Sequence, residues 1–466
     1  MKFSNGQYFR TALFSSAAAG LMRLADHWLT NRATWGWDFV SRKSGRRQNA
    51  SRTRTAATIA LIPCALLGVI GSAAETPKAP PVYFNWAFES GSIGQIDKLG
   101  ENEFRLHVVG QQDARGRNRQ ATWYYFRMEN VGGRTLTLHF ADFLGEYNDV
   151  PATRPPVGAS YRPWFSEDNV HWNHVNDIGW DREKGEATIT LRPQSNTIWV
   201  AHVAPYTHGR LLRLLDEVGR SPHAYIEVIG KSALGRDLHL VTITDPAKPD
   251  AEKKVVWLMA RQHPWETGTS FIMEGALRFL ISDDPLAQKL RGETIFKLMP
   301  MMNPDGVARG DCRFNVNGYD TNRGWDVVDL RDKQWLEKTP EIWYVKTRIL
   351  AEHARHPIAI MVNLHTDESN EYFESMIDAQ PEQGRLDRLY AALAEKTLFD
   401  PSRPKISLVG TGPMNTTASL WREARVPVVT MERRITTSKK LGRVAMPEDN
   451  LQLGRELIST MAEIAQ

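Results

Sequence analysis

The chain has 466 residues, of which 42% are hydrophobic and 24% are charged, as in an ordinary globular protein. This length exceeds what one hydrophobic core usually organises, so it predicts two domains. The formal net charge is +4, but residues 1–74 hold ten Lys and Arg against two Asp and Glu, and the remainder therefore carries −4. A mildly acidic body lacks the basic footprint of a nucleic-acid-binding protein, and we expect no nucleic-acid partner.

Residues 1–74 form a leader that contains a signal-like pattern. Arg52 and Arg54 precede an apolar stretch from Ala56 to Gly71, and small residues follow it. This order is typical of a secretory signal, and about 16 apolar residues are few for a membrane-spanning helix. We expect export to the periplasm or the medium, without stable membrane insertion after signal removal. A true start near residue 50 would explain why some fifty residues precede the pattern, and a long leader is the alternative explanation. The alternatives to export are a single-pass anchor and a cytoplasmic protein.

Residues 75–204 are predicted to form a small all-β sandwich domain. Short β-rich runs, separated by turn signals, lie at 124–128, 136–140, 187–191 and 198–203. Several short strands at this spacing are typical of a sandwich. Six tryptophans fall in this domain: Trp86, Trp123, Trp164, Trp172, Trp180 and Trp199. We favour a core or interface for these side chains over a platform that stacks on carbohydrate.

Residues 205–466 alternate strand and helix patterns, which predicts an α/β domain with a mixed, mostly parallel sheet flanked by helices. Strands are expected at 225–229, 238–244, 255–260, 295–299, 358–364 and 426–431. Helices are expected from Leu211 onward and at 267–280, 342–354, 383–396 and 451–465. Because open α/β sheets bind ligands at the carboxyl ends of their strands, polar residues there are the candidate site residues.

Two of these strand ends carry histidines that suit a metal. The strand at 255–260 leads into His263-Pro264-Trp265-Glu266, and His365 closes the strand at 358–364. A His and a Glu three residues apart can direct an imidazole and a carboxylate at one zinc ion, and catalytic zinc typically takes three protein ligands. Cys312 is the one cysteine after the leader, so we expect a packed thiol and no cysteine zinc cluster.

A third strand end carries Glu432, after the run at 426–431. A carboxylate there can take a proton from water, which a zinc hydrolase needs. A salt bridge to Arg433 or Arg434 is the structural alternative.

The segment between the two histidines contains a turn and a candidate anion pocket. Asn303-Pro304-Asp305-Gly306 marks the turn. Arg313 and the run Asp320-Thr321-Asn322-Arg323 follow, and arginine side chains suit carboxylates because they bind them bidentately.

The order of these motifs resembles the zinc carboxypeptidase family, over roughly residues 206–435. The β-rich domain and the run 204–212 are similar to the cytosolic-carboxypeptidase-like branch, which has bacterial members. The resemblance implies a single zinc ion held by His263, Glu266 and His365. It also implies roles for four groups: Asp320 orients His263, Arg313 stabilises the oxyanion, Asn322 and Arg323 clamp the terminal carboxylate of the substrate, and Glu432 is general base and then acid.

We therefore predict a zinc metallocarboxypeptidase that hydrolyses the carboxy-terminal peptide bond of peptides or protein tails. A zinc deacylase of the succinylglutamate desuccinylase or aspartoacylase kind shares the ligand geometry. A glycan-binding or wall-associated module with an inactive peptidase domain is the alternative from another class.

Two features remain open in the sequence. Relatives often have glycine at the position of Trp265. The indole of Trp265 either narrows the cleft or packs beneath the metal. Five basic residues near Glu432 form either a pocket for an acidic terminal side chain or solvated surface: Arg425, Arg433, Arg434, Lys439 and Lys440.

Overall fold

The computed structural model describes residues 79–147, 149–376, 381–408 and 414–466. Residues Pro81–Gln466 belong to one compact unit, which contains both a β-rich segment and an α/β segment. The expected signal-like leader lies outside the described residues. Among the described residues, no helix has the length and apolarity needed to cross a membrane.

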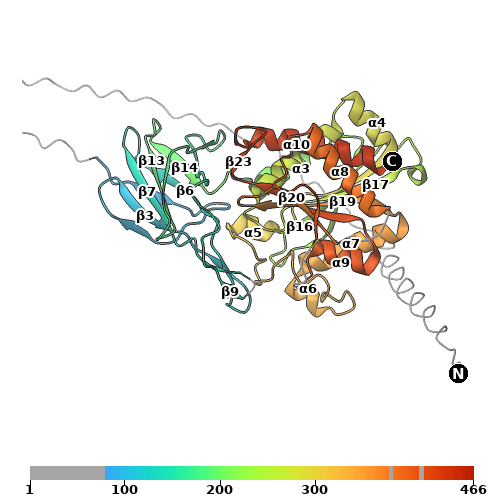
Figure 1. Ribbon diagram of the computed structural model, residues 1–466, viewed down its shortest axis with the longest axis horizontal. Coiled ribbons are helices and arrows are strands. Elements are labelled where there is room, and N and C mark those ends of the chain that lie inside the picture. The colour runs from blue at the N-terminus through green and yellow to red at the C-terminus, as the bar shows by residue number, and fades with distance from the viewer. Residues whose placement is uncertain (1–78, 148, 377–380, 409–413) are drawn as a thin grey trace, which may run out of the picture. The chain divides into compact units, whose positions relative to one another are not determined.

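The β-rich segment consists mainly of two five-stranded sheets (Figure 1). One sheet has the order β1 (Tyr83–Asn85), β6 (Tyr125–Glu129), β14 (Thr197–Ala201), β10 (Trp164–Ser166), β11 (Asn173–His174). The other has the order β12 (Ile178–Asp181), β13 (Glu186–Leu191), β7 (Leu136–Ala141), β3 (Glu103–His107), β2 (Ile96–Lys98). Alternate residues of β7, such as Leu136 and Leu138, are buried in the core that the two sheets share.

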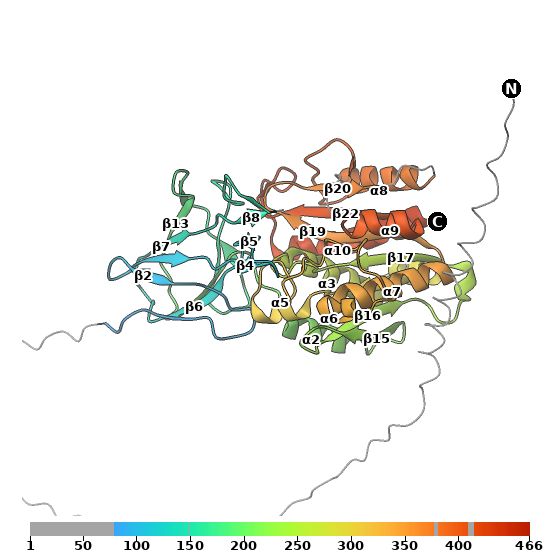
Figure 2. The same ribbon diagram turned by 90° about the horizontal axis from the view of Figure 1, so that it is seen from below.

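Two small hairpins extend from these sheets toward the α/β segment. One pairs β4 (Gln111–Gln112) with β5 (Arg119–Gln120), and the other pairs β8 (Glu146–Tyr147) with β9 (Val150–Pro151). β4, β5 and β8 lie where the two segments meet (Figure 2). Direct contact is made there, since the backbone N–H of Ala114 donates to the carbonyl of Gly318 at 2.9 Å.

The α/β segment is built on an eight-stranded mixed sheet. Its order is β15 (Ala224–Lys231), β16 (Asp237–Ile243), β18 (Thr294–Met299), β17 (Lys254–Met259), β19 (Ile358–Asp367), β22 (Val428–Arg434), β20 (Tyr372–Ser375), β21 (Ser407–Leu408). β18, β17, β19 and β22 pair in parallel, so their carboxyl ends meet at one edge. A separate hairpin joins β23 (Thr437–Ser438) to β24 (Arg443–Val444).

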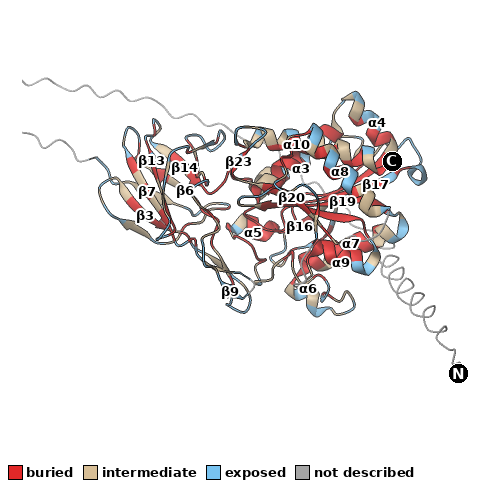
Figure 3. Cartoon of the chain, viewed as in Figure 1, coloured by how far each residue is buried: buried red, intermediate tan, exposed pale blue. Residues whose placement is uncertain are grey.

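Helices cover both faces of this sheet (Figure 1). They are α2 (His208–Val218), η1 (Asp250–Glu252), α3 (Thr267–Ile281), α4 (Pro285–Glu293), α5 (Pro304–Arg309), α6 (Gln334–Lys338), α7 (Pro340–Arg355), α8 (Glu382–Lys396), α9 (Thr416–Ala424) and α10 (Pro447–Ala465). In β17, Val256 and Leu258 belong to the core that includes α3 and α10, whereas Val255 and Trp257 belong to the core that includes α7. Both cores are buried against the sheet (Figure 3). The predicted sandwich followed by a mixed, helix-flanked sheet is confirmed.

The tryptophans of the β-rich segment are mostly packed rather than displayed. Trp123, Trp164 and Trp172 are buried in a core that also contains residues of the α/β segment, while Trp86 is 40% exposed. Large rings in a shared core stabilise the contact between the two segments by burying apolar area.

Candidate active site

The structure brings His263, Glu266 and His365 together at the carboxyl edge of the parallel strands. His263 and Glu266 lie in the connection from β17 to α3, and His365 lies in β19; all three are buried. Nδ1 of His263 is 2.7 Å from Oε1 of Glu266, and Nδ1 of His365 is 3.0 Å from Oε2. One nitrogen or oxygen atom from each residue lies within 4.8 Å of the others, which is the spacing of a shared ion.

These three residues fit a zinc ion. Oε2 of Glu266 is buried and has no hydrogen-bond partner, although Nδ1 of His365 lies beside it. Burial would raise the pKa of Glu266, but the facing imidazoles of His365 and His263 hold it below its usual value. A ligand must be deprotonated to bind metal, and two imidazoles with one carboxylate form a donor set of catalytic zinc.

Asp320 supports His263 from the side opposite Glu266. Its Oδ1 lies 3.0 Å from Nε2 of His263, so the imidazole donates from Nε2 and leaves Nδ1 for the metal. Nε of Arg313 donates to the other oxygen of Asp320 at 2.7 Å. Burial would raise the pKa of Asp320, but Arg313 and His263 hold it well below its usual range.

His365 has a corresponding support in Gln262, which is not among the residues predicted from the sequence motifs. Nε2 of His365 lies 2.8 Å from Oε1 of Gln262, and the glutamine amide donates to the carbonyl of Thr321. Gln262 is fully buried one residue before His263. The sequence signal that could have indicated Gln262 is a polar residue between a buried strand and the candidate metal motif.

Glu432 lies beside the metal ligands because its strand is a neighbour of β19. In the parallel pairing of β19 with β22, Glu432 is opposite His365. The alternative salt bridge is not formed, because the guanidinium groups of Arg433 and Arg434 pair with Glu371. Burial, reinforced by the carboxylates of Glu266 and Asp367, raises the pKa of Glu432 well above its usual value.

Asn322 and Arg323 face the same cleft as the metal ligands. Thr416 donates to Oδ1 of Asn322 from its backbone nitrogen at 3.1 Å and from its hydroxyl at 2.9 Å. Because the oxygen is occupied in this way, the NH₂ of the amide is available to an anion. The cleft has a volume of about 400 Å³ and is lined by His263, Glu266, Arg313, Asn322, Arg323 and Glu432, among others.

Asn303-Pro304-Asp305-Gly306 is a structural element beneath this cleft. Asn303 caps α5 by accepting from the backbone nitrogen of Gly306 at 3.0 Å. The carboxylate of Asp305 is buried and accepts from the Ser232 hydroxyl at 2.8 Å and from Arg236 at 2.8 Å. The motif therefore joins the connection between β15 and β16 to the metal-bearing edge.

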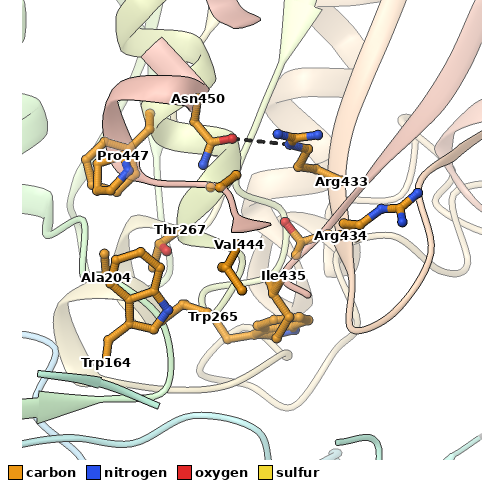
Figure 4. Close-up of a pocket in the computed structure, with 15 residues that line it drawn as sticks. Trp164, Ala204, Trp265, Thr267, Arg433, Arg434, Ile435, Val444, Pro447 and Asn450 are labelled. Atoms are coloured by element: carbon orange, nitrogen blue, oxygen red, sulfur yellow. Dashed lines mark hydrogen bonds between the residues drawn. The ribbon is translucent and has the colours of Figure 1, made fainter. Parts of the chain in front are cut away.

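Trp265 is buried beside the candidate metal ligands and lines the wall of the cleft. Its side chain is 3% exposed, and its ring meets that of His202 edge-on at 5.5 Å. It also lines a second, smaller cavity of about 40 Å³ together with Trp164, Ile435 and Val444 (Figure 4).

The basic residues near Glu432 do not form the suggested pocket for an acidic side chain. Arg433 pairs with Glu371. It also donates a hydrogen bond to Asn450 (Figure 4). Lys440 donates to the carbonyl of Thr397, and Arg425 stacks on Trp421 at 5.0 Å. The described part of the cleft lining includes none of the five.

Comparisons with known proteins agree with this geometry. Residues 84–203 match a family described as the cytosolic carboxypeptidase N-terminal domain, and residues 211–369 match the zinc carboxypeptidase family. Human cytosolic carboxypeptidase 6 is 32% identical over 274 residues, which cover 56% of this chain and 52% of that protein. The uncharacterized protein ZMO1242 of Zymomonas mobilis is 26% identical, over 82% of this chain and 96% of its own length.

Solved structures show the same fold. A metallo-carboxypeptidase from Pseudomonas aeruginosa superposes with a TM-score of 0.70 at 22% identity, covering 82% of this chain and all of that one. The metallo-carboxypeptidase from Burkholderia cenocepacia gives 0.68 at 23% identity, covering 82% and 98%. By contrast, the chain spans 31% of mouse cytosolic carboxypeptidase 3 and about half of the human protein.

The predicted export is wrong in the light of these comparisons. Curated relatives include cytosolic carboxypeptidases 2, 3 and 6, and the matched amino-terminal domain bears the same description. Composition misled here because a short apolar run with basic and small flanking residues does not by itself distinguish a secretory signal from another apolar segment.

Proposed function

We propose that this chain hydrolyses the carboxy-terminal peptide bond of peptides or protein tails, because it belongs to the zinc carboxypeptidase family. The observation that carries the proposal is the common cleft of the buried His263–Glu266–His365 cluster and the candidate carboxylate clamp at Asn322 and Arg323. A metal centre supports hydrolysis, and an adjacent clamp restricts it to the last bond of a chain.

His263, Glu266 and His365 would hold one zinc ion, with Asp320 and Gln262 fixing the two imidazoles. When bound, zinc polarises the scissile carbonyl and lowers the pKa of a water from about 15.7 toward 7. Glu432 would accept the proton of the attacking water and pass it to the leaving amine. The raised pKa of this carboxyl supports the first step, since a carboxylate with a higher pKa is a stronger base than an ordinary glutamate.

Arg313 and the clamp would handle the negative charges of the substrate. The guanidinium of Arg313 is held by Asp320 next to the metal ligands, where it can stabilise the developing oxyanion. The amide of Asn322 and the guanidinium of Arg323 would bind the terminal carboxylate, and arginine suits this role because of its fixed donor geometry.

The zinc deacylase and the glycan-binding module receive less support. A deacylase shares the ligand set, but the amino-terminal domain match and the anion clamp favour a peptidase. A glycan platform would need displayed rings, and most of the tryptophans in question are packed.

One experiment separates the three. Zinc content would be measured alongside hydrolysis of peptides that differ only in the last residue, of the same peptides with an amidated terminus, and of N-acyl amino acids. We expect about one zinc per chain, cleavage of the free-carboxylate peptides alone, and loss of activity on chelation that added zinc restores. Cleavage of N-acyl amino acids without peptide cleavage would identify a deacylase, and a zinc-free, inactive protein would refute the proposal.

A further inference from the structure

The β-rich segment holds the loop that carries Arg313. Oε1 of Gln111, in β4, accepts hydrogen bonds from the backbone nitrogens of Arg313 and Phe314, both at 2.7 Å. The Gln111 amide donates back to the carbonyl of Phe314 at 3.0 Å. A side chain from a strand far away in sequence thus fixes the backbone of a cleft residue.

The second hairpin places Tyr147 against both arginines of the cleft. The phenol oxygen of Tyr147 accepts a hydrogen bond from Nη2 of Arg323. The centre of its ring lies 5.1 Å from the guanidinium carbon of Arg313 and 5.9 Å from that of Arg323. Both distances are within the range of cation–π attraction. Tyr147 lines the cleft and is 42% exposed, so a ligand in the cleft can reach it.

The hairpin is anchored at Asp149, which directly precedes β9. The backbone N–H of Asp149 donates to Asn118 at 2.6 Å, and its carboxylate pairs with Arg115 at 2.9 Å and with Arg117 at 2.8 Å. These partners belong to the connection between β4 and β5, so the two hairpins are joined to each other. Tyr147 is therefore supported from within its own segment as well as by the arginines.

We propose that Tyr147 is a substrate-positioning residue which the β-rich segment supplies to the cleft. Its ring braces Arg313 and Arg323. Because its oxygen accepts from Arg323, its own proton is available to donate to the terminal carboxylate of a peptide. The inference rests on the proposed function and extends it. The site for the terminal carboxylate is completed by the β-rich segment and is not built by the α/β segment alone.

Tyr147→Phe tests this in the full chain, because it keeps the ring and removes only the hydroxyl. Tyr83→Phe is the matched control, on an exposed residue of β1 in the same segment. We expect the KM for a free-carboxylate peptide to rise about tenfold in Tyr147→Phe, as for loss of a hydrogen bond to a charged group, with kcat within about twofold. Tyr83→Phe should match the wild type in both.

The affinities for two small zinc-binding inhibitors separate a specific effect on the carboxylate site from a general structural defect. Benzylsuccinic acid carries a free carboxylate for the clamp, whereas acetohydroxamic acid has none. We expect Tyr147→Phe to weaken binding of benzylsuccinic acid by about the same tenfold factor and to leave acetohydroxamic acid unchanged. Equal weakening of both would assign the effect to the metal centre and overturn the inference.

The failure of this inference can be told from failure of the proposed function. If the wild type is active and contains zinc, and Tyr147→Phe has the same KM and the same affinity for both inhibitors, then only the role of Tyr147 is refuted. A wild type without zinc or hydrolysis would refute both.

Discussion

Nε2 of His365 lies 2.8 Å from Oε1 of Gln262, and this contact mirrors the 3.0 Å contact between Nε2 of His263 and Asp320. Each imidazole thereby donates from its outer nitrogen and turns Nδ1 toward Glu266. The two supports differ in charge: Asp320 is a carboxylate paired with Arg313, while Gln262 is a neutral amide in a fully buried position. A neutral partner at His365 keeps a further buried charge away from the metal site.

We predict that Gln262→Met weakens zinc binding by about 10- to 100-fold, the usual cost of losing such a support. Methionine fills a similar volume but cannot accept the proton of Nε2, so the imidazole of His365 loses its fixed tautomer. The zinc retained at increasing concentrations of a competing chelator gives the measurement. Gln262→Glu keeps an acceptor and should retain zinc better than Gln262→Met. A Gln262→Met protein that holds zinc as the wild type does would contradict this view of the site.

We predict that Glu432→Gln lowers kcat by at least about 100-fold while the zinc content stays unchanged. The amide has the shape of the carboxyl but cannot accept the proton of the attacking water. Steady-state peptide hydrolysis and metal analysis of the same preparation give the two values. Glu395→Gln, on an exposed position of α8, is the control for loss of one negative charge. Undiminished hydrolysis by Glu432→Gln would remove Glu432 from the mechanism.

The spatial cluster of His263, Glu266, His365 and Glu432 could be predicted from the sequence because these residues lie at or after strand ends. His263 and Glu266 come directly after β17, His365 is in β19, and Glu432 is in β22, and these strands are neighbours. Residues at the carboxyl edge of adjacent parallel strands meet without further assumptions.

Contacts set by tertiary packing could not be predicted in this way. Tyr147 sits in a two-residue strand, and nothing local indicates that it reaches Arg323. The suggested basic pocket is not formed, for a related reason. Successive residues of a strand point to opposite faces, so Arg433 points away from the cleft that Glu432 lines. α9 was also missed, because its first residues are threonines, which are weak helix formers.

We predict that Asn322→Asp lowers kcat/KM by about 100-fold or more, mainly through KM. The hydroxyl and backbone nitrogen of Thr416 keep their acceptor at Oδ1, so the second oxygen of the new carboxylate faces the cleft in place of the amide NH₂. It then repels the terminal carboxylate that it should bind. Asn196→Asp, at an exposed position of the β-rich segment, is the control, and an equal effect of both changes would argue against a carboxylate site at Asn322.

Glu368 is predicted to make stability depend on pH. Burial and the neighbouring Asp367 raise the pKa of this cleft-lining carboxyl to about 7, from an ordinary value of 4.5. Below the ordinary value, both the folded and the unfolded chain hold the proton, and the contribution of Glu368 to stability is at its highest. As the pH rises toward 7, the unfolded chain releases its proton first, so the contribution is progressively lost, and above 7 the folded state carries the charge in a half-buried position.

Glu368→Gln imitates the protonated side chain and should remove this dependence. Melting temperatures of the zinc-loaded proteins should agree near pH 4.5, and at pH 8 the variant should melt higher than the wild type by about 2–4 °C. Glu395→Gln should follow the wild type across the same range, because its side chain is exposed. If Glu368→Gln melted lower than the wild type at pH 8, the carboxylate would be stabilised in the folded cleft, and Arg313 would outweigh burial in setting its ionisation.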